Sequence, residues 1–199
     1  MNLKNYAYYY PDGFNKKLCH DIINYSKQFD FKTGVTGDKD ARKRQSDIIW
    51  FKNETWIAKE IMNFIDDANK KAEWNFELLK LEAIQFTKYA HNQFYTWHTD
   101  DWKEPYKKGE ENEGLQRKLS FVCNLVEPDD YLGGNLEIHV PLHPPDSFSY
   151  KDNVLDISKQ NYKMGSIVVF PSFLFHRVKP IRVGIRYSLV GWCLGKPLR

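Results

Sequence analysis

Cysteine is scarce in this chain, and its spacing matches neither disulfide-rich nor zinc-binding proteins. The 199 residues contain 3 cysteines, Cys19, Cys123 and Cys193, and no Cys-x-x-Cys pair. A small, odd number without that spacing predicts neither a disulfide framework nor a zinc knuckle. Cys123 and Cys193 lie in apolar runs and are expected to be small core residues.

Long apolar runs and an excess of one charge are lacking too. No apolar run reaches the roughly 18 residues of a membrane span, and the first six residues contain no hydrophobic signal region. Lys+Arg 29 against Asp+Glu 26 gives a net charge of only +3, which gives no support for nucleic-acid binding by itself. We expect a soluble, cytoplasmic protein without membrane or nucleic-acid partners; its oligomeric state cannot be read from the sequence.

Aromatic residues, by contrast, are abundant. They make up 16% of the chain and apolar residues make up 42%, which suits a sizeable core, an all-β sandwich and an aromatic-lined pocket. The length predicts one domain over residues 1–199. Within it we expect an N-terminal helical support and lid in residues 1–75 and a β core in residues 76–199.

The N-terminal part shows helical periodicity in two places. Residues 6–14 read as a short strand that ends in a Pro-Asp-Gly turn. From a plausible N-cap at Asn15, apolar positions up to Phe29 predict a helix of about four turns. Apolar residues at helical spacing predict a second helix over residues 54–73. Both helices should pack against the back of a sheet.

Residues 33–47 lie between these helices and lack apolar periodicity. Two glycines and dense charge predict a mobile loop. Its basic cluster, residues 42–44, is either a solvated surface or part of a lid that faces the substrate.

The second part of the chain is dominated by short β segments separated by Gly and Pro turns. This pattern predicts a jelly roll, in which two sheets cover each other. A long charged loop is expected over residues 101–117 and an irregular excursion over residues 141–163. The expected strands cover residues 78–90, 93–98, 119–126, 135–140, 166–170 and 186–193.

The stretch Trp97-His-Thr-Asp100 carries the first sign of chemistry. In a strand, His98 and Asp100 point to the same face, and two histidines with one carboxylate are typical of non-haem Fe(II) oxygen chemistry. His176, after a hydrophobic strand, is the candidate third ligand. Arg186, ten residues later, could bind a carboxylate through two hydrogen bonds. A lone His-x-Asp is common by chance, and Zn(II) in a cupin hydrolase is the competing metal assignment.

His139 and His143 form a second histidine pair that could bind a metal. His143 lies in Leu-His-Pro-Pro, a predicted loop without a third ligand nearby. We therefore expect no metal there.

Several ordered motifs give the chain a family resemblance. Residues 83–194 resemble the Fe(II)/2-oxoglutarate-dependent dioxygenase superfamily, and more narrowly its prolyl 4-hydroxylase branch. The matching pieces are Tyr89 before His98-Thr-Asp100, Arg117-Lys-Leu-Ser-Phe-Val-Cys-Asn-Leu125, Tyr131-Leu-Gly-Gly-Asn-Leu-Glu137, Gly165-Ser-Ile-Val-Val-Phe-Pro171, His176-Arg-Val-Lys-Pro180 and Arg186-Tyr-Ser188 followed by Trp192.

The resemblance implies a mainly β fold with N-terminal helices around a double-stranded β-helix (jelly-roll, cupin-like) core. It also implies the cofactor set: Fe(II), 2-oxoglutarate as cosubstrate, O2, and ascorbate as an auxiliary reductant. His98, Asp100 and His176 would bind the metal, as the catalytic centre together with Arg186.

The same resemblance assigns residues to the cosubstrate. Arg186 would bind its C5 carboxylate, and Ser188 would add a hydrogen bond. Tyr89 and Asn124 align with cosubstrate contacts, although ordinary strand packing explains both equally well. Trp192 is expected to be a packing residue.

The expected activity is hydroxylation of a C–H bond coupled to decarboxylation of 2-oxoglutarate. A prolyl residue of a protein or peptide is the expected substrate, with a small molecule as the alternative. Two other functions remain open: a non-catalytic cupin-like binding or sensing domain, and a nucleic-acid demethylase, which only the basic cluster at residues 42–44 supports. The complete ligand set argues against a non-catalytic domain.

In the resembling enzymes an Arg-x-Ser stretch frames the pocket mouth, and Arg44-Gln-Ser46 is similar to it.

Overall fold

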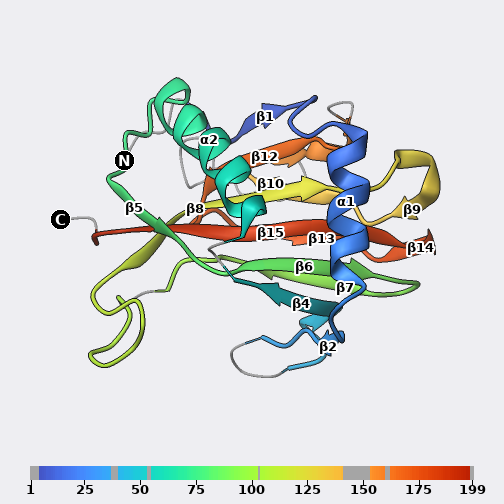
Figure 1. The fold of residues 1–199 in the computed structure, drawn as a ribbon, viewed down its shortest axis with the longest axis horizontal. Helices are drawn as coiled ribbons and strands as arrows, with labels where there is room; N and C mark the ends of the chain where they lie inside the picture. The colour runs from blue at the N-terminus through green and yellow to red at the C-terminus, as the bar shows by residue number, and fades with distance from the viewer. Residues whose placement is uncertain are drawn as a thin grey trace.

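The structure is a computed structural model that describes residues 5–36, 40–52, 55–102, 104–140, 153–159 and 162–197. Over these residues the chain is mainly β, with two α-helices, α1 (Lys16–Ser26) and α2 (Trp56–Lys71) (Figure 1). Two short 3-10 helices are η1 (Pro128–Asp130) and η2 (Ile157–Lys159). The strands are β1 (Tyr8–Tyr10), β2 (Lys32–Thr33), β3 (Arg44–Gln45), β4 (Asp47–Phe51), β5 (Leu78–Leu81), β6 (Ile84–Tyr89), β7 (Phe94–His98), β8 (Gln116–Asn124), β9 (Tyr131–Gly133), β10 (Leu136–His139), β11 (Val154–Asp156), β12 (Ile167–Pro171), β13 (His176–Val178), β14 (Ile181–Gly184) and β15 (Arg186–Gly195).

Two sheets form the body of the fold. The large sheet has the order β1-β12-β8-β15-β6-β4-β2, with β5 paired to β15, and the small sheet has the order β11-β10-β13-β7-β3. Strands β9 and β14 form a separate pair. Buried side chains from both sheets, among them Val122, Phe170, Leu136 and Val178, make one apolar cluster. The two sheets therefore face each other, as the jelly-roll prediction requires.

Both helices cover the outer face of the large sheet. Figure 1 shows α1 crossing in front of the strands, with α2 to its upper left. Ile22 of α1 and Ile61 of α2 are fully buried in a second cluster that includes Phe86 and Leu189 from the sheet. The predicted packing of two helices on the back of a sheet is confirmed.

Helix α1 is shorter than the predicted four turns. Asn15 is its N-cap, as predicted, and its side chain accepts a hydrogen bond from the backbone N–H of Leu18. The helix ends at Ser26, so Phe29 lies beyond it and instead packs its ring against Tyr25.

Two predicted irregular segments contain strands. In residues 33–47, β3 pairs with β7 and the first residue of β4 pairs with β6, so the prediction of a mobile loop is wrong for these parts. In residues 141–163, β11 pairs with β10. These strands are short, and their pairing partners are distant in the sequence, so no local periodicity marks them. His143 lies outside the described residues.

Alternation along β15 places side chains in two environments. Leu189 and Cys193 point to the helical side, whereas Arg186, Ser188 and Val190 line a cavity between the sheets. The last strand of the fold thus carries polar residues into the interior.

No helix among the described residues is long and apolar enough to cross a membrane.

A buried hydrogen-bonded asparagine links α2 to the sheet. The Asn69 side chain, 8% exposed, donates to the carbonyl of Phe76 and accepts from its N–H, at 2.9 and 3.0 Å. Asn69→Ala leaves both backbone groups unpaired, so we expect a loss of about 1–3 kcal/mol in the free energy of unfolding, measured by urea denaturation. The exposed Asn24→Ala is the control, with an expected change below about 0.5 kcal/mol. Equal effects of the two substitutions would contradict this role.

Candidate metal centre and cavity

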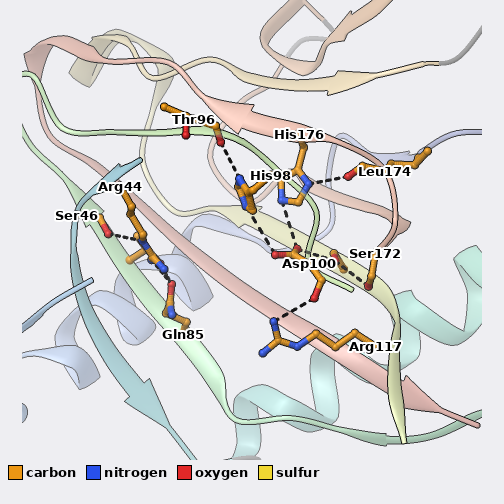
Figure 2. A network of polar contacts seen from close by, with 12 residues as sticks. Arg44, Ser46, Gln85, Thr96, His98, Asp100, Arg117, Ser172, Leu174 and His176 are labelled. Atoms are coloured by element: carbon orange, nitrogen blue, oxygen red, sulfur yellow. Dashed lines mark hydrogen bonds and ion pairs between the residues drawn. The ribbon is translucent and has the colours of Figure 1, made fainter. Parts of the chain in front are cut away.

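Three predicted ligands meet where the small sheet borders the cavity. His98 ends β7 and His176 begins β13, and the two residues are direct partners in the antiparallel register. Asp100 follows β7, and its backbone N–H donates to the carbonyl of Ser172 at 2.9 Å. The potential ligand atoms of the three residues lie within 4.8 Å of one another (Figure 2).

Hydrogen bonds orient each of these side chains. The Nδ1 atoms of His98 and His176 lie 2.8 and 3.0 Å from the carbonyl oxygens of Thr96 and Leu174. An Nδ1–H donor leaves Nε2 with its lone pair, and both Nε2 atoms face Asp100, at 3.7 and 3.3 Å. This is the arrangement of histidine ligands whose second nitrogen is held by the protein.

The environment keeps the site in a form that can bind a cation. Burial, together with the nearby His176, lowers the pKa of His98 to about 3, so its imidazole is neutral. Burial alone would raise the pKa of Asp100, but His176 lowers it well below its usual range. In the same way Asp100 outweighs burial and raises the pKa of His176. Asp100 is thus ionised and His98 neutral, as metal ligands must be, and a cation that binds at Asp100 displaces the proton that the carboxylate favours on His176.

A cavity of about 380 Å³ opens beside these residues. Its wall combines aromatic, aliphatic and charged side chains from both sheets. Its lining residues include Val35, Arg44, Gln85, Tyr89, Tyr95, His98, Asp100, Trp102, Arg117, Val122, Leu136, His176, Val178, Arg186, Ser188, Val190 and Trp192.

Arg186 is a fully buried cation on this wall. Its Nη2 donates to the hydroxyl of Tyr162 at 3.2 Å, while its Nε and Nη1 make no hydrogen bond to any described residue. The hydroxyl of Ser188 is buried and unpaired in the same way. Burial raises the pKa of Tyr162, so this neighbour stays neutral. The cluster offers several donors and no counter-charge, which fits a ligand carboxylate.

Gly134 makes room for this arginine. Its φ is +63°, and a Cβ there would lie 2.3 Å from Ile181 Cδ1 and 3.2 Å from Arg186 Cδ. A side chain at this position would clash with the residues that hold the guanidinium in place.

Of the other two predicted cosubstrate contacts, Tyr89 lines the cavity and Asn124 does not. Tyr89 is the register partner of Arg186 on β6 and lines the cavity. Asn124 is the partner of Ser188 on β8, but the cavity wall does not include it, and its amide nitrogen donates to the carbonyl of Val126. A direct cosubstrate contact through Asn124 stays a prediction.

Three residues of the site, Tyr162, Tyr95 and Ser120, were not among the predicted site residues. Tyr162 lies in the stretch expected to be irregular. Tyr95 stacks on His98 with ring centroids 3.5 Å apart, a contact that its position three residues earlier in an aromatic run could have suggested. Ser120 Oγ donates to Asp100 Oδ2 at 2.7 Å. Arg44, expected on a solvated loop, on a lid or at the pocket mouth, is 8% exposed and lines the cavity.

The predicted loop over residues 101–117 is shorter than expected, because Gln116 and Arg117 already belong to β8, and Trp102 and Arg117 line the cavity. Arg117 donates to Glu82 at 2.6 Å and to the backbone carbonyl of Asp100. Its guanidinium also lies 3.8 Å from the ring of Trp192, which lines the cavity in addition to packing.

These features define a class of site. Two imidazoles and one carboxylate on one side of a cavity, with the remaining directions open, are the donor set of mononuclear non-haem Fe(II) centres. A buried carboxylate-binding group in the same cavity suits an organic acid as cosubstrate. The residues present therefore fit both Fe(II) and 2-oxoglutarate.

Comparison with known proteins places the chain in a family. Residues 84–194, more than half of the chain, match the 2OG-Fe(II) oxygenase superfamily, and the chain belongs to this superfamily. Its relatives include PKHD-type hydroxylases from Crocosphaera subtropica (31% identical over 112 residues, 56% of this chain and 42% of that protein) and Synechococcus sp. strain CC9605 (28% over 113 residues, 57% and 42%). The match spans about two fifths of the length of these curated relatives.

Solved structures share the fold over nearly the whole chain. A Pseudomonas putida prolyl-4-hydroxylase superposes with a TM-score of 0.67 at 18% identity, covering 98% of this chain and 95% of that chain. The viral collagen prolyl hydroxylase of Paramecium Bursaria Chlorella virus-1, in complex with 2OG, gives a TM-score of 0.65 at 16% identity, covering 96% and 97%. The predicted double-stranded β-helix core with N-terminal helices is confirmed.

Ser120 provides a test of how the carboxylate ligand is held. Ser120→Ala removes the hydrogen bond to Asp100 Oδ2, and loss of such a supporting contact weakens metal binding by about 10–100-fold. Anaerobic titration with Fe(II) or Co(II) measures this. Ser158→Ala, at an exposed serine, should leave the affinity unchanged. Unaltered affinity in Ser120→Ala, with Asp100→Ala abolishing binding, would contradict the role of this hydrogen bond.

Proposed function

We propose that the protein is an Fe(II)- and 2-oxoglutarate-dependent hydroxylase. His98, Asp100 and His176 bind the metal, and Arg186 binds the C5 carboxylate of the cosubstrate. The bound metal, cosubstrate and O2 supply the oxidation of a C–H bond, with succinate and CO2 as the other products. The proposal includes ascorbate as an auxiliary reductant.

The single observation that carries the proposal is the buried guanidinium of Arg186, whose Nε and Nη1 have no hydrogen-bond partner among the described residues, in the cavity of the three ligands. A buried cation without a counter-charge is costly unless a ligand supplies one. 2-Oxoglutarate has a carboxylate at each end, so one end can approach the metal while the other reaches Arg186. Ser188 and Tyr162 then hold the guanidinium and the carboxylate in one orientation.

The protein's own contribution is orientation and exclusion of water. Val122, Leu136, Val178 and Val190 give the cavity an apolar wall between the two polar ends. Displacing water from this wall strengthens the ion pair at Arg186, because the local dielectric falls. Tyr95, stacked on His98, restricts the rotation of that imidazole.

A prolyl residue of a protein or peptide is the proposed substrate. The support is the likeness to prolyl hydroxylase structures, among them one from Trichoplax adhaerens in complex with a hypoxia inducible factor oxygen degradation domain peptide fragment. A small molecule is the alternative substrate within the same activity.

Arg186 gives the test of cosubstrate binding. In Arg186→Gln we expect the KM for 2-oxoglutarate to rise by at least about 100-fold, since a charge-assisted bidentate contact is lost. Arg186→Lys should fall between this variant and the wild type. Succinate formation is the measurement, and the exposed Arg182→Gln is the matched control.

Substitution of the proposed metal ligands gives a second test of the proposed function. His98→Ala and His176→Ala should abolish succinate formation, whereas the exposed His20→Ala should not change it. Turnover that persists in either ligand variant would overturn the proposed function.

A further inference from the structure

The strand that carries His98 has one residue more than its neighbour at this point. In the pairing of β7 with β13, His98 lies opposite His176, and the next pair is Tyr95 with Val178. Two residues separate these pairs on β7, but only one separates them on β13. The extra residue makes a β-bulge, a feature that bends a strand and changes the direction of its side chains. The bulge lies directly before a metal ligand.

This bulge explains why two side chains three positions apart share one face. Tyr95 and His98 both line the cavity, and their ring centroids are 3.5 Å apart. In a regular strand, residues three positions apart point to opposite faces. Without the extra residue, either the phenol or the imidazole would therefore point to the outer face of the small sheet.

The backbone of the bulge also orients the imidazole. The carbonyl oxygen of Thr96, the first bulge residue, lies 2.8 Å from His98 Nδ1 (Figure 2), which leaves Nε2 for a metal. Thr96 is itself held by Lys43. Its backbone N–H and its hydroxyl both donate to the Lys43 carbonyl, at 2.8 and 3.1 Å. The direction of one metal ligand thus depends on the geometry of the bulge.

Arg177 is the residue of β13 opposite the bulge. It points to the outer face of the small sheet, since the residues before and after it line the cavity. Its Cζ lies 4.5 Å from the ring centroid of Trp97, the second bulge residue. Its Nε and Nη2 each lie 2.7 Å from Glu137 Oε2 on β10. Glu137 is 4% exposed and also pairs with Lys179 at 2.6 Å. Arg177 therefore connects the bulge to a buried carboxylate on the other neighbour of β13.

We propose that the bulge of Thr96 and Trp97, held from the outer face by Arg177, aims His98 at the metal centre, so that Trp97 and Arg177 are positioning residues for iron binding. This inference rests on the proposed function, because it takes His98 as a metal ligand. The lining of the cavity includes neither Trp97 nor Arg177. Both side chains therefore act through the backbone of β7 and not by contact with the metal or a substrate.

The chain offers a matched control in the second basic partner of Glu137. Arg177→Met and Lys179→Met each remove one positive charge and leave the carboxylate with one basic partner. The two side chains are similarly exposed, at 34% and 43%. Lys179 follows the end of β13 and does not lie opposite the bulge. Charge alone would make a cation easier to bind in both variants, so weaker binding in only one of them reports the bulge.

The first measurement is the affinity of each variant for Co(II), a stand-in for Fe(II) that is stable in air. We expect Arg177→Met to weaken binding by about tenfold, as loss of a supporting contact behind a metal ligand does. Arg177→Lys should weaken it less, and Lys179→Met should stay within about twofold of the wild type. Trp97→Leu should behave like Arg177→Met, whereas Trp97→Phe keeps an aromatic face for the guanidinium and should restore most of the affinity.

The second measurement separates positioning from a general loss of stability. In protein loaded with diamagnetic Zn(II), NMR detects the Nδ1–H protons of His98 and His176, which are assigned through their proximity to Thr96 and Leu174. In Arg177→Met we expect the His98 signal to shift and to exchange faster with water, while the His176 signal stays in place. A general loosening of the fold would change both signals.

Equal Co(II) affinities of Arg177→Met and Lys179→Met would overturn the inference, and so would equal changes in both imidazole signals. If circular dichroism shows that Arg177→Met does not fold, Trp97→Leu and Trp97→Phe decide, and equal affinities of these two variants would overturn it. Each of these results leaves the proposed function intact. Wild-type protein that binds no divalent metal would remove the proposed function and this inference together.

Discussion

The antiparallel register of β13 against β7 is the constraint on which the site depends. It sets His176 directly opposite His98, although the two residues are far apart in the sequence. Because successive side chains in a strand alternate between faces, a shift by one residue would turn one imidazole away from the other. The contacts of the two Nδ1 atoms with the carbonyl oxygens of Thr96 and Leu174 orient the imidazole rings. They do not determine how the two strands pair.

Buried charge is the second organising feature. Around the metal centre the negative charge of Asp100 is balanced by neighbouring imidazoles and by the cation that it is arranged to bind. Arg186 and Arg44 are different, because their described neighbours are neutral. A buried charge without a partner of opposite sign is destabilising. The fold thus presents one carboxylate with two imidazoles and two basic groups, Arg186 and Arg44, to one cavity, and the apolar wall between them lowers the local dielectric.

Much of the fold and part of the site could be predicted from the sequence. The shared face of His98 and Asp100 follows from strand periodicity, and the helices follow from their apolar spacing, because both signals are local. His176 and Arg186 needed the order of several motifs, since spacing alone does not bring distant strands together. Tyr162 was missed as a site residue, and Arg44 was expected near the pocket mouth only through the family resemblance. Arg44 contacts Tyr95, and Tyr162 contacts Arg186. Both contacts join residues that are distant in the sequence, so no local sequence pattern predicts them.

The most direct measurement of the central claim is anaerobic absorption spectroscopy of the purified protein. Fe(II) is added first and 2-oxoglutarate second, and the visible charge-transfer absorption of the keto acid with the metal is followed. The account predicts a band in the wild type that is absent in His98→Ala and needs far more 2-oxoglutarate in Arg186→Gln. Metal binding without any such band in the wild type would contradict the account, because the metal and the cosubstrate would then not share one site.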